Sequence, residues 1–206
     1  MNTTALKQYT TTASAGYMGA IKTEGSKSHK YLYGAELSTE VKKALQEVLS
    51  PELKKSQVRA KIKTYSGGQH LTITLVLDKS VYAPNIEEFK ELVKDRVKRL
   101  KYNWIWKTEN GVYSQVFHQE YYKVTDEERR NIEDATAAQM VNFEFNQNEL
   151  NINHYHINDE IMLNDKGKEI LKTANTVILA FNYDDSNSMV DYFDTNFYYS
   201  INIKWI

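Results

Sequence analysis

Apolar residues recur with helical spacing in one early stretch of the chain, residues 38–50. They lie three or four positions apart and so form one stripe along a helix: Val41, Ala44, Leu45, Val48 and Leu49. Ser38 precedes the stripe, and its hydroxyl can accept a hydrogen bond from a free backbone N–H, so we expect it to cap the helix. Pro51 restricts the residue before it and predicts that the helix ends there.

Two stretches of alternating polarity follow, separated by the turn sequence Tyr65-Ser66-Gly67-Gly68. Before the turn, Arg59, Lys61 and Lys63 alternate with apolar residues, and after it leucine and isoleucine occupy every second position from 71 to 77. This period of two is typical of half-buried strands. The paired glycines allow positive φ, so the turn predicts a hairpin. The order helix, strand, turn, strand is the unit around which we expect the fold to be built.

The middle of the chain predicts two capped helices with a hairpin between them. Asn85 and Glu88 have the spacing of a capping box, and so do Thr125 and Glu128. Asn110-Gly111 favours a two-residue turn between two strands. The expected elements are a helix that begins at 85, strands at 102–107 and 112–122, and a helix at 126–139.

The last third of the chain predicts one more helix and two more strand pairs. We expect Asn164 to cap the helix, which we place up to Thr173. The strand pairs are expected at 142–146 with 150–157, and at 176–182 with 197–205. The end of the chain would then repeat the order helix, strand, turn, strand, which predicts two related units.

These patterns predict an α+β fold, with a mixed or antiparallel sheet of several hairpins and about four helices. We expect a flexible N-terminal arm over residues 1–30, which are rich in Thr, Ser, Ala and Gly. A basic α+β unit over residues 31–124 and an acidic α+β unit over residues 125–206 are expected to pack on each other, as one domain or two.

The net charge of −1 conceals an uneven distribution along the 206 residues. Residues 22–101 contain 17 Lys and Arg against 10 Asp and Glu, whereas residues 102–206 contain 8 against 17. A basic half joined to an acidic half predicts either charged partners such as nucleic acid, or two halves that complement each other within the molecule. The sequence leaves both interpretations open.

Composition excludes some classes of site and favours a compartment. Cysteine is absent, so disulfides and thiolate metal sites are excluded. No apolar run approaches the roughly 20 residues that span a bilayer, and the N-terminus lacks the apolar segment of a signal peptide. We therefore expect a soluble, cytoplasmic protein without a membrane partner.

No catalytic motif stands out, and we expect no catalytic residue, no cofactor and no bound metal. His154 and His156 lie two apart on an expected strand and would share one face, which leaves open whether they bind a metal. Asp184, Ser186 and Ser188 imitate the opening of a calcium loop. A polar turn is the simpler explanation, because the glycine and the glutamate of such a loop are missing.

Two sets of residues are candidates for binding macromolecules. Cations on the first strand and on the helix after the second strand can contact phosphates, and they are the expected nucleic-acid-binding residues: Arg59, Lys61, Lys63, Lys90, Lys94, Lys98, Arg99 and Lys101. An acidic segment with aromatic residues near the C-terminus holds the expected partner-binding residues: Asp184, Asp185, Asp191, Tyr192, Phe193 and Asp194.

The first helix, the basic strand, the turn Tyr65-Ser66-Gly67-Gly68 and the alternating strand together resemble the large polyvalent protein-associated domains of phages and conjugative elements. The resemblance covers roughly residues 38–100. Those domains tend to continue with Asp-Gly-Pro after the second strand, where this chain has Asp78 and, six positions later, Pro84. That family has no established catalytic residues, so the resemblance implies a mobile-element setting and not a reaction.

We therefore expect a phage or mobile-element protein, not an enzyme, that binds and inhibits a host defence nuclease complex in the host-cell cytoplasm. Such an anti-CRISPR or anti-defence activity would depend on the charged and aromatic surfaces, with a CRISPR effector nuclease as an example of the partner. The alternative is a DNA- or RNA-binding accessory module of a conjugative or phage system. A third hypothesis, a metal-dependent nuclease, would depend on Asp184. The target and the oligomeric state do not follow from the sequence.

Overall fold

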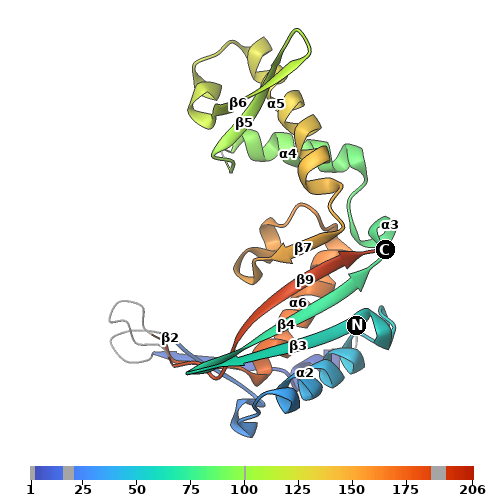
Figure 1. Cartoon of the computed structure of the whole chain (residues 1–206), viewed down its shortest axis with the longest axis vertical. Coiled ribbons are helices and arrows are strands. Elements are labelled where there is room, and N and C mark those ends of the chain that lie inside the picture. Colours follow the sequence, from blue (N-terminus) through green and yellow to red (C-terminus); the bar gives the residue numbers. More distant parts are fainter. Residues whose placement is uncertain (1–2, 16–20, 100, 187–193) are drawn as a thin grey trace.

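The structure of the chain is a computed structural model that describes residues 3–15, 21–99, 101–186 and 194–206 (Figure 1). This part of the chain contains nine strands in mixed and antiparallel sheets, and four helices of seven or more residues. The expected α+β class is therefore confirmed.

A four-stranded mixed sheet forms the centre of the fold. Its middle strands, β4 and β9, run parallel to each other, and each outer strand is antiparallel to its neighbour. In order across the sheet, the strands are β3 (Val58–Tyr65), β4 (Gly68–Leu77), β9 (Tyr198–Trp205) and β7 (Glu149–Ile152). The predicted β3–β4 hairpin is confirmed, and Gly67 has the positive φ of +85° that its turn requires, whereas Gly68 does not.

Helices α2 (Ala35–Val48) and α6 (Asp165–Phe181) cover one face of this sheet (Figure 1). The alternation of β4 puts Leu71, Ile73 and Leu75 on that face, where each is fully buried. Their registered partners on β9 project to the same side, and Ile201 and Ile203 are likewise buried. Burial of each such side chain contributes about 1.5–3 kcal/mol, so this layer supplies most of the stability of the centre.

The first 30 residues, expected to be a flexible arm, contain regular structure that packs on α6. They include α1 (Thr3–Lys7), β1 (Thr11–Ala15), β2 (Ile21–Gly25) and the 3₁₀ turn η2 (Ser28–Lys30). Strand β2 lies between β1 and the short β8 (Tyr183–Asp184), and Tyr9 is only 1% exposed. The polar sequence did not predict this arrangement, because the strands are short and some of their pairing partners are distant in the sequence.

A second hydrophobic cluster is built mainly from the segment between β4 and β7, at the upper end of the molecule in Figure 1, with Ile161 and Met162 added from beyond β7. Helices α4 and α5 pack against each other there, although the expected boundary between the basic and acidic units, after residue 124, falls between them. The elements of this segment are α3 (Lys79–Tyr82), α4 (Ile86–Lys98), β5 (Trp104–Glu109), β6 (Val112–Phe117), η4 (His118–Tyr122), α5 (Asp126–Met140) and the π-helical η5 (Val141–Phe145).

The short-range signals in this segment are confirmed. Both predicted capping boxes form, with the Glu88 N–H donating to Asn85 Oδ1 at 2.9 Å and the corresponding bond at the start of α5. The turn between β5 and β6 has positive φ at Asn110 and Gly111. At α6, the N–H of Gly167 donates to the side chain of Asn164, as the expected cap requires.

Five local predictions are wrong. The strand expected at 112–122 ends at Phe117, and residues 118–122 form the 3₁₀ segment η4. Helix α2 begins three residues before Ser38, after Gly34, and the Ser38 hydroxyl donates back to the carbonyl of Ala35. Residues 176–182 are not a strand, because α6 continues to Phe181 with buried residues at helical spacing. Residues 142–145 lie in η5 and Asn146 caps it, and most of 150–157 lies in the short strand β7 and the 3₁₀ segment η6 (His154–Asp159). Strand β9 pairs with β4 and β7, so the expected repeat of helix, strand, turn, strand is absent from the described residues.

One buried hydroxyl, that of Thr136, links α5 to the β5–β6 hairpin by two hydrogen bonds. Thr136 is fully buried, accepts the N–H of Trp106 at 2.8 Å and donates to its carbonyl. The change Thr136→Val leaves that N–H without a partner and should lower the free energy of unfolding by about 1–3 kcal/mol, measured in urea. Thr136→Ser keeps the hydroxyl and should cost only about 0.8 kcal/mol. Equal stability of Thr136→Val and the unchanged protein would contradict this role.

Candidate nucleic-acid interface

The face of the four-stranded sheet that points away from α2 and α6 is polar and carries a row of cations. Arg59, Lys61 and Lys63 occupy alternate positions of β3, opposite to the residues that pack on α2. Their side chains are exposed, and within the described part of the chain none of the three forms an ion pair. Successive charges are about 6.6–6.8 Å apart along the strand. This spacing is close to that of neighbouring phosphates on a nucleic-acid strand.

Each cation has a polar neighbour on β4 and β9 in the same row across the sheet. Lys63 lies beside His70, which in turn lies beside Tyr198, whose side chain is 46% exposed. His70 Nε2 is 3.2 Å from Ser200 Oγ, and this hydroxyl reaches Thr72 Oγ1 at 3.4 Å. The face therefore combines phosphate-binding charges, hydroxyls and an exposed ring, which are the groups that bind single-stranded nucleic acid.

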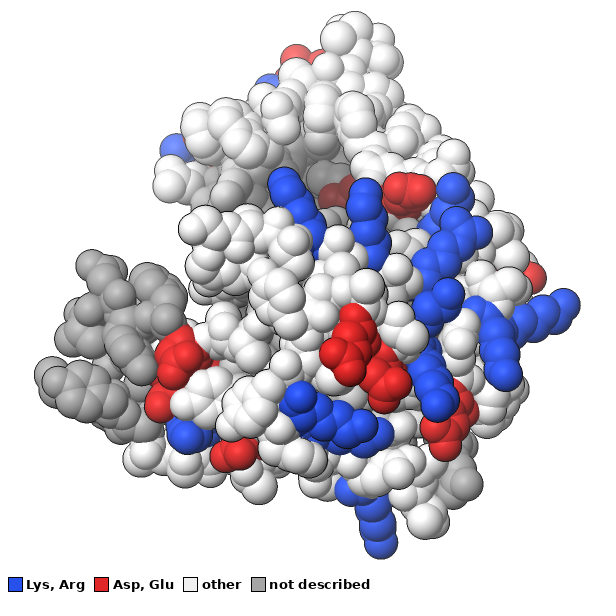
Figure 2. Space-filling view, turned by 60° about the horizontal axis from the view of Figure 1, so that its bottom comes forward, with Lys and Arg blue, Asp and Glu red and all other residues white. Residues whose placement is uncertain are grey.

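Figure 2 brings the lower part of Figure 1 forward, the side that holds α2 and β3. Lys and Arg side chains are spread over this side, and the Asp and Glu side chains form smaller groups between them. The cations on this side of the molecule are therefore favourable for an anionic polymer.

The predicted cations of α4 behave differently, because most of them are neutralised by carboxylates. Lys94 Nζ lies 2.9 Å from Asp134 of α5 and 2.9 Å from Glu91 of its own helix. Hydrogen bonds to these two carboxylates raise the pKa of Lys94 above its usual value. The other contacts of this kind are Lys90 with Glu87, Lys98 with Glu133, and Arg99 with Asp95. Two of these ion pairs, Lys94 with Asp134 and Lys98 with Glu133, join the basic half to the acidic half, and the others lie within the basic half.

Arg99 and Lys101 also belong to a second basic region. Both line a hollow of about 470 Å³ between α4 and η6, together with Arg96 and Lys168. Two carboxylates share this hollow, and one of them is already paired with Arg99. Lys168 could not be assigned to this place from the sequence, because it comes from α6, far along the chain.

The expected partner-binding segment is only partly described. Asp191, Tyr192 and Phe193 lie outside the described residues. The N–H of Asp185 donates to the carbonyl of Asp194, and the N–H of Ser186 donates to the carboxylate of Asp184. The bond from Ser186 to Asp184 is that of an Asx-type turn, whereas Ser188 and the other residues of the segment between 187 and 193 lie outside the described residues.

The histidine pair does not lie on a strand. His154 and His156 belong to η6, where His154 stacks on Tyr199 at 4.3 Å and His156 Nδ1 lies 3.9 Å from Asp159. Because the two rings have different neighbours, the expectation that they share one face is wrong. In the ranges that the structure describes, no group of three His, Asp or Glu residues is arranged to hold a metal ion.

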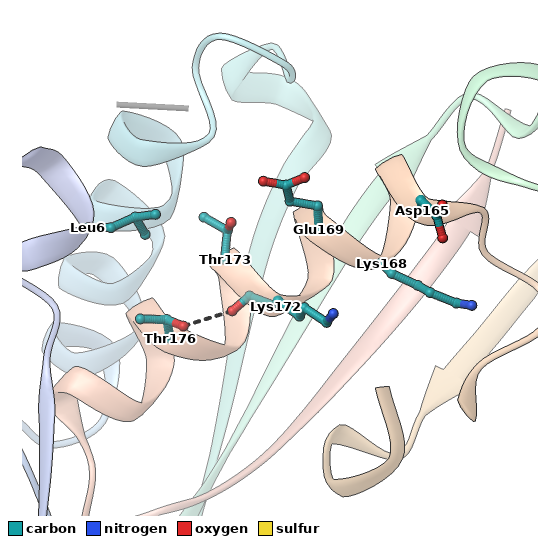
Figure 3. Close-up of a pocket in the computed structure, with 7 residues that line it drawn as sticks. All are labelled: Leu6, Asp165, Lys168, Glu169, Lys172, Thr173 and Thr176. Carbon is teal, nitrogen blue, oxygen red and sulfur yellow. Dashed lines mark hydrogen bonds between the residues drawn. The ribbon is translucent and has the colours of Figure 1, made fainter. Parts of the chain in front are cut away.

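A pocket of about 530 Å³ beside α6 is shown in Figure 3. Leu6 reaches it from α1, and every other side chain comes from successive turns of α6. Lys168 and Glu169 point in different directions. The Thr176 hydroxyl donates a hydrogen bond to the carbonyl of Lys172 at 2.9 Å. These groups do not converge on a point where a reacting atom could sit, so this pocket is not a candidate active site.

The environment of His154 predicts a pH dependence of stability. Burial lowers the pKa of His154 below its usual 6.5, because the charged ring is poorly solvated there. As pH falls below about 6.5, the unfolded chain takes up a proton that the folded state resists, so the free energy of unfolding should decrease on acidification. His154→Phe keeps a ring but cannot be protonated and should reduce this dependence, measured by urea unfolding at pH 7.5 and 5.5. An unchanged pH profile in His154→Phe would contradict the assignment.

Comparison of the chain with protein family models, with curated proteins and with solved structures found no match. Among the described helices, none combines the length and the apolar character needed to cross a membrane. Because no relative indicates the function, it has to be inferred from the side chains of the open sheet face.

Proposed function

We propose that this protein acts by binding and not by catalysis, and that it contacts nucleic acid through the open face of its central sheet. The observation that carries the proposal is the row formed by Arg59, Lys61 and Lys63, which is exposed and free of ion pairs among the described residues. A polar, exposed sheet face with helices only on its other side is a known type of platform for single-stranded nucleic acid. The mobile-element setting implied by the sequence resemblance agrees with such a role.

A salt titration tests the proposal directly. Three phosphate contacts should give micromolar affinity for bare single strands and a slope of about −2 in a plot of log K against log salt concentration. A duplex with the same three contacts should give a slope of about −2.7. Fluorescence anisotropy with labelled oligonucleotides between 50 and 300 mM salt measures both slopes. An absence of binding at the lowest salt concentration would exclude the proposal.

A second candidate function is inhibition of a host defence nuclease complex, and an exposed aromatic pair on the β5–β6 hairpin favours it. Trp104 and Phe117 stack at 3.9 Å and are 43% and 57% exposed. Tryptophan and phenylalanine are enriched in protein interfaces, where a few such residues supply most of the binding energy. This surface, and not the acidic segment alone, is the place where a protein partner would bind.

Co-purification with a CRISPR effector nuclease, followed by a cleavage assay, tests the second candidate. Trp104→Ala should then weaken inhibition by about 30-fold or more, the size typical of a central interface residue. Tyr33→Ala removes another exposed ring, outside the hairpin, and should have no effect. Full cleavage by a panel of effectors at saturating protein would remove this candidate.

A further inference from the structure

A small pocket of about 250 Å³ lies at the edge of the central sheet, apart from the row of cations. Its lining comes from six places in the sequence: β1, β2, the residues of η6, helix α6, the end of β8 and the start of β9. Its volume is below the roughly 300 Å³ at which pockets for drug-sized ligands begin. The pocket therefore fits a single ring system and not a larger ligand.

Aromatic rings form one part of the pocket wall. The ring of His154 lies 4.3 Å from the ring of Tyr199 at an interplanar angle of 29°, and 4.1 Å from the ring of Tyr155. His154 and Tyr199 are partly buried, so these rings are held in place by the surrounding chain. His154 therefore lies between the two tyrosine rings, and the stack presents its edges and the outer faces of the tyrosines to a planar ligand. Burial keeps the pKa of His154 low, which leaves the ring uncharged at neutral pH.

Polar groups form the remainder of the wall. The hydroxyl of Tyr199 donates to Asn175 Oδ1 at 2.7 Å, which fixes the amide and leaves Nδ2 as the end that can donate to a ligand. Asp184 supplies a carboxylate acceptor, and Thr11 and Thr23 line the same pocket with hydroxyls that can donate or accept. Donors and acceptors beside a flat ring surface match the hydrogen-bonding edge of a nucleobase, for which Asn and Asp side chains are usual partners.

We propose that this pocket binds a single nucleobase. The base can belong to a free nucleoside or to an oligonucleotide, and the chemistry of the site is the same for both. The pocket lies at the end of β9 where Tyr198 and Tyr199 project to opposite faces of the sheet, the first beside His70 and the second into the pocket wall. The proposal does not depend on Arg59, Lys61 and Lys63, because none of these β3 cations lines the pocket.

The experiment titrates the protein with adenosine, guanosine, cytidine and uridine by calorimetry, and separately with short oligonucleotides that contain or lack one base. His154→Ala should weaken the binding of the preferred nucleoside by roughly 5- to 150-fold, the range for the loss of one base–aromatic stack. His154→Phe keeps a ring and should retain most of the affinity. His156→Ala is the matched control, because this exposed histidine of the same segment does not line the pocket.

The nucleoside titrations and the oligonucleotide titrations together show whether the bound base comes from a free nucleoside or from a strand. Binding of free nucleosides assigns a nucleoside site, whereas binding only of the base-containing oligonucleotide assigns a site for one base of a strand. Asn175→Asp replaces the amide donor by a carboxylate and should weaken binding or change which base is preferred. The proposal is overturned if no nucleoside and no base-containing oligonucleotide binds in preference to its base-free counterpart. It is also overturned if His154→Ala and Asn175→Asp, both folded by circular dichroism, bind every base like the unchanged protein.

A failure of the nucleobase proposal can be distinguished from a failure of nucleic-acid binding at the open sheet face. Reversal of the β3 charges removes the phosphate contacts but leaves the nucleoside pocket intact, so nucleoside binding should survive it. Conversely, His154→Ala should leave the salt dependence of oligonucleotide binding unchanged, because it removes no charge from the open face.

Discussion

Reversal of the three charges on β3, in the variant R59E/K61E/K63E, is expected to abolish the binding of bare nucleic acid. Each phosphate contact that is lost should reduce the salt slope by about one, and the introduced carboxylates should repel the backbone. Single reversals should weaken binding uniformly across sequences, because phosphate contacts carry no sequence information. Anisotropy titrations of the triple variant and of each single variant measure both effects.

The control for this prediction carries the same change in net charge at another place. Lys43, Lys54 and Lys55 are exposed and do not belong to β3, so K43E/K54E/K55E should keep most of the affinity. If both triple variants lose binding equally, the effect comes from net charge, and the β3 row has no special role. If neither loses it, the nucleic acid binds elsewhere, with the basic hollow between α4 and η6 as the next region to alter.

Gly25→Ala is expected to destabilise the protein more than any other single methyl group added to a glycine on the described strands. A Cβ at Gly25 would collide with the backbone carbonyls of Leu179 and Ala180 in α6, and backbone cannot rotate away as a side chain can. The cost should be about 3 kcal/mol or more, which lowers Tm by roughly 6–12 °C in a chain of this length. Differential scanning calorimetry measures the shift.

Gly67→Ala is the comparison variant, because nothing lies within 4 Å of the added Cβ and only the positive φ of +85° is strained. Its cost should be about 1–2 kcal/mol. A neutral Gly25→Ala would mean that β2 is not packed on α6, and that the N-terminal residues form the flexible arm expected from their composition.

Local signals were sufficient to predict much of the fold. The helical stripe of α2, the alternation of β3 and β4, and the capping boxes at Asn85 and Thr125 depend on residues a few positions apart, so the sequence contains them directly. The strand expected at 176–182 is wrong, because a short apolar run fits a buried strand and a buried helix equally well. In the structure this run belongs to α6, which is buried on several sides.

The candidate site was predictable only in part, because many of its contacts join residues that are far apart in the sequence. Alternation predicted that Arg59, Lys61 and Lys63 share one face, but not that α2 and α6 pack on the opposite face. The charges of α4 were visible in the sequence, yet Asp134, which neutralises Lys94, lies 40 positions away and could not be paired with it in advance. The pocket beside His154 combines six segments of the chain, and no spacing in the sequence indicates it.

Strand β9 fills the place between β4 and β7, and this has a consequence for how the chain folds during synthesis. Thr72 and Ser200, which are hydrogen-bonded across β4 and β9, are 128 positions apart. At typical ribosome speeds, the β3–β4 hairpin waits roughly 6–26 seconds with an open edge before its neighbour is made. The intervening segment has its own hydrophobic cluster, so its early collapse would shorten the loop to be closed and reduce the time available for aggregation.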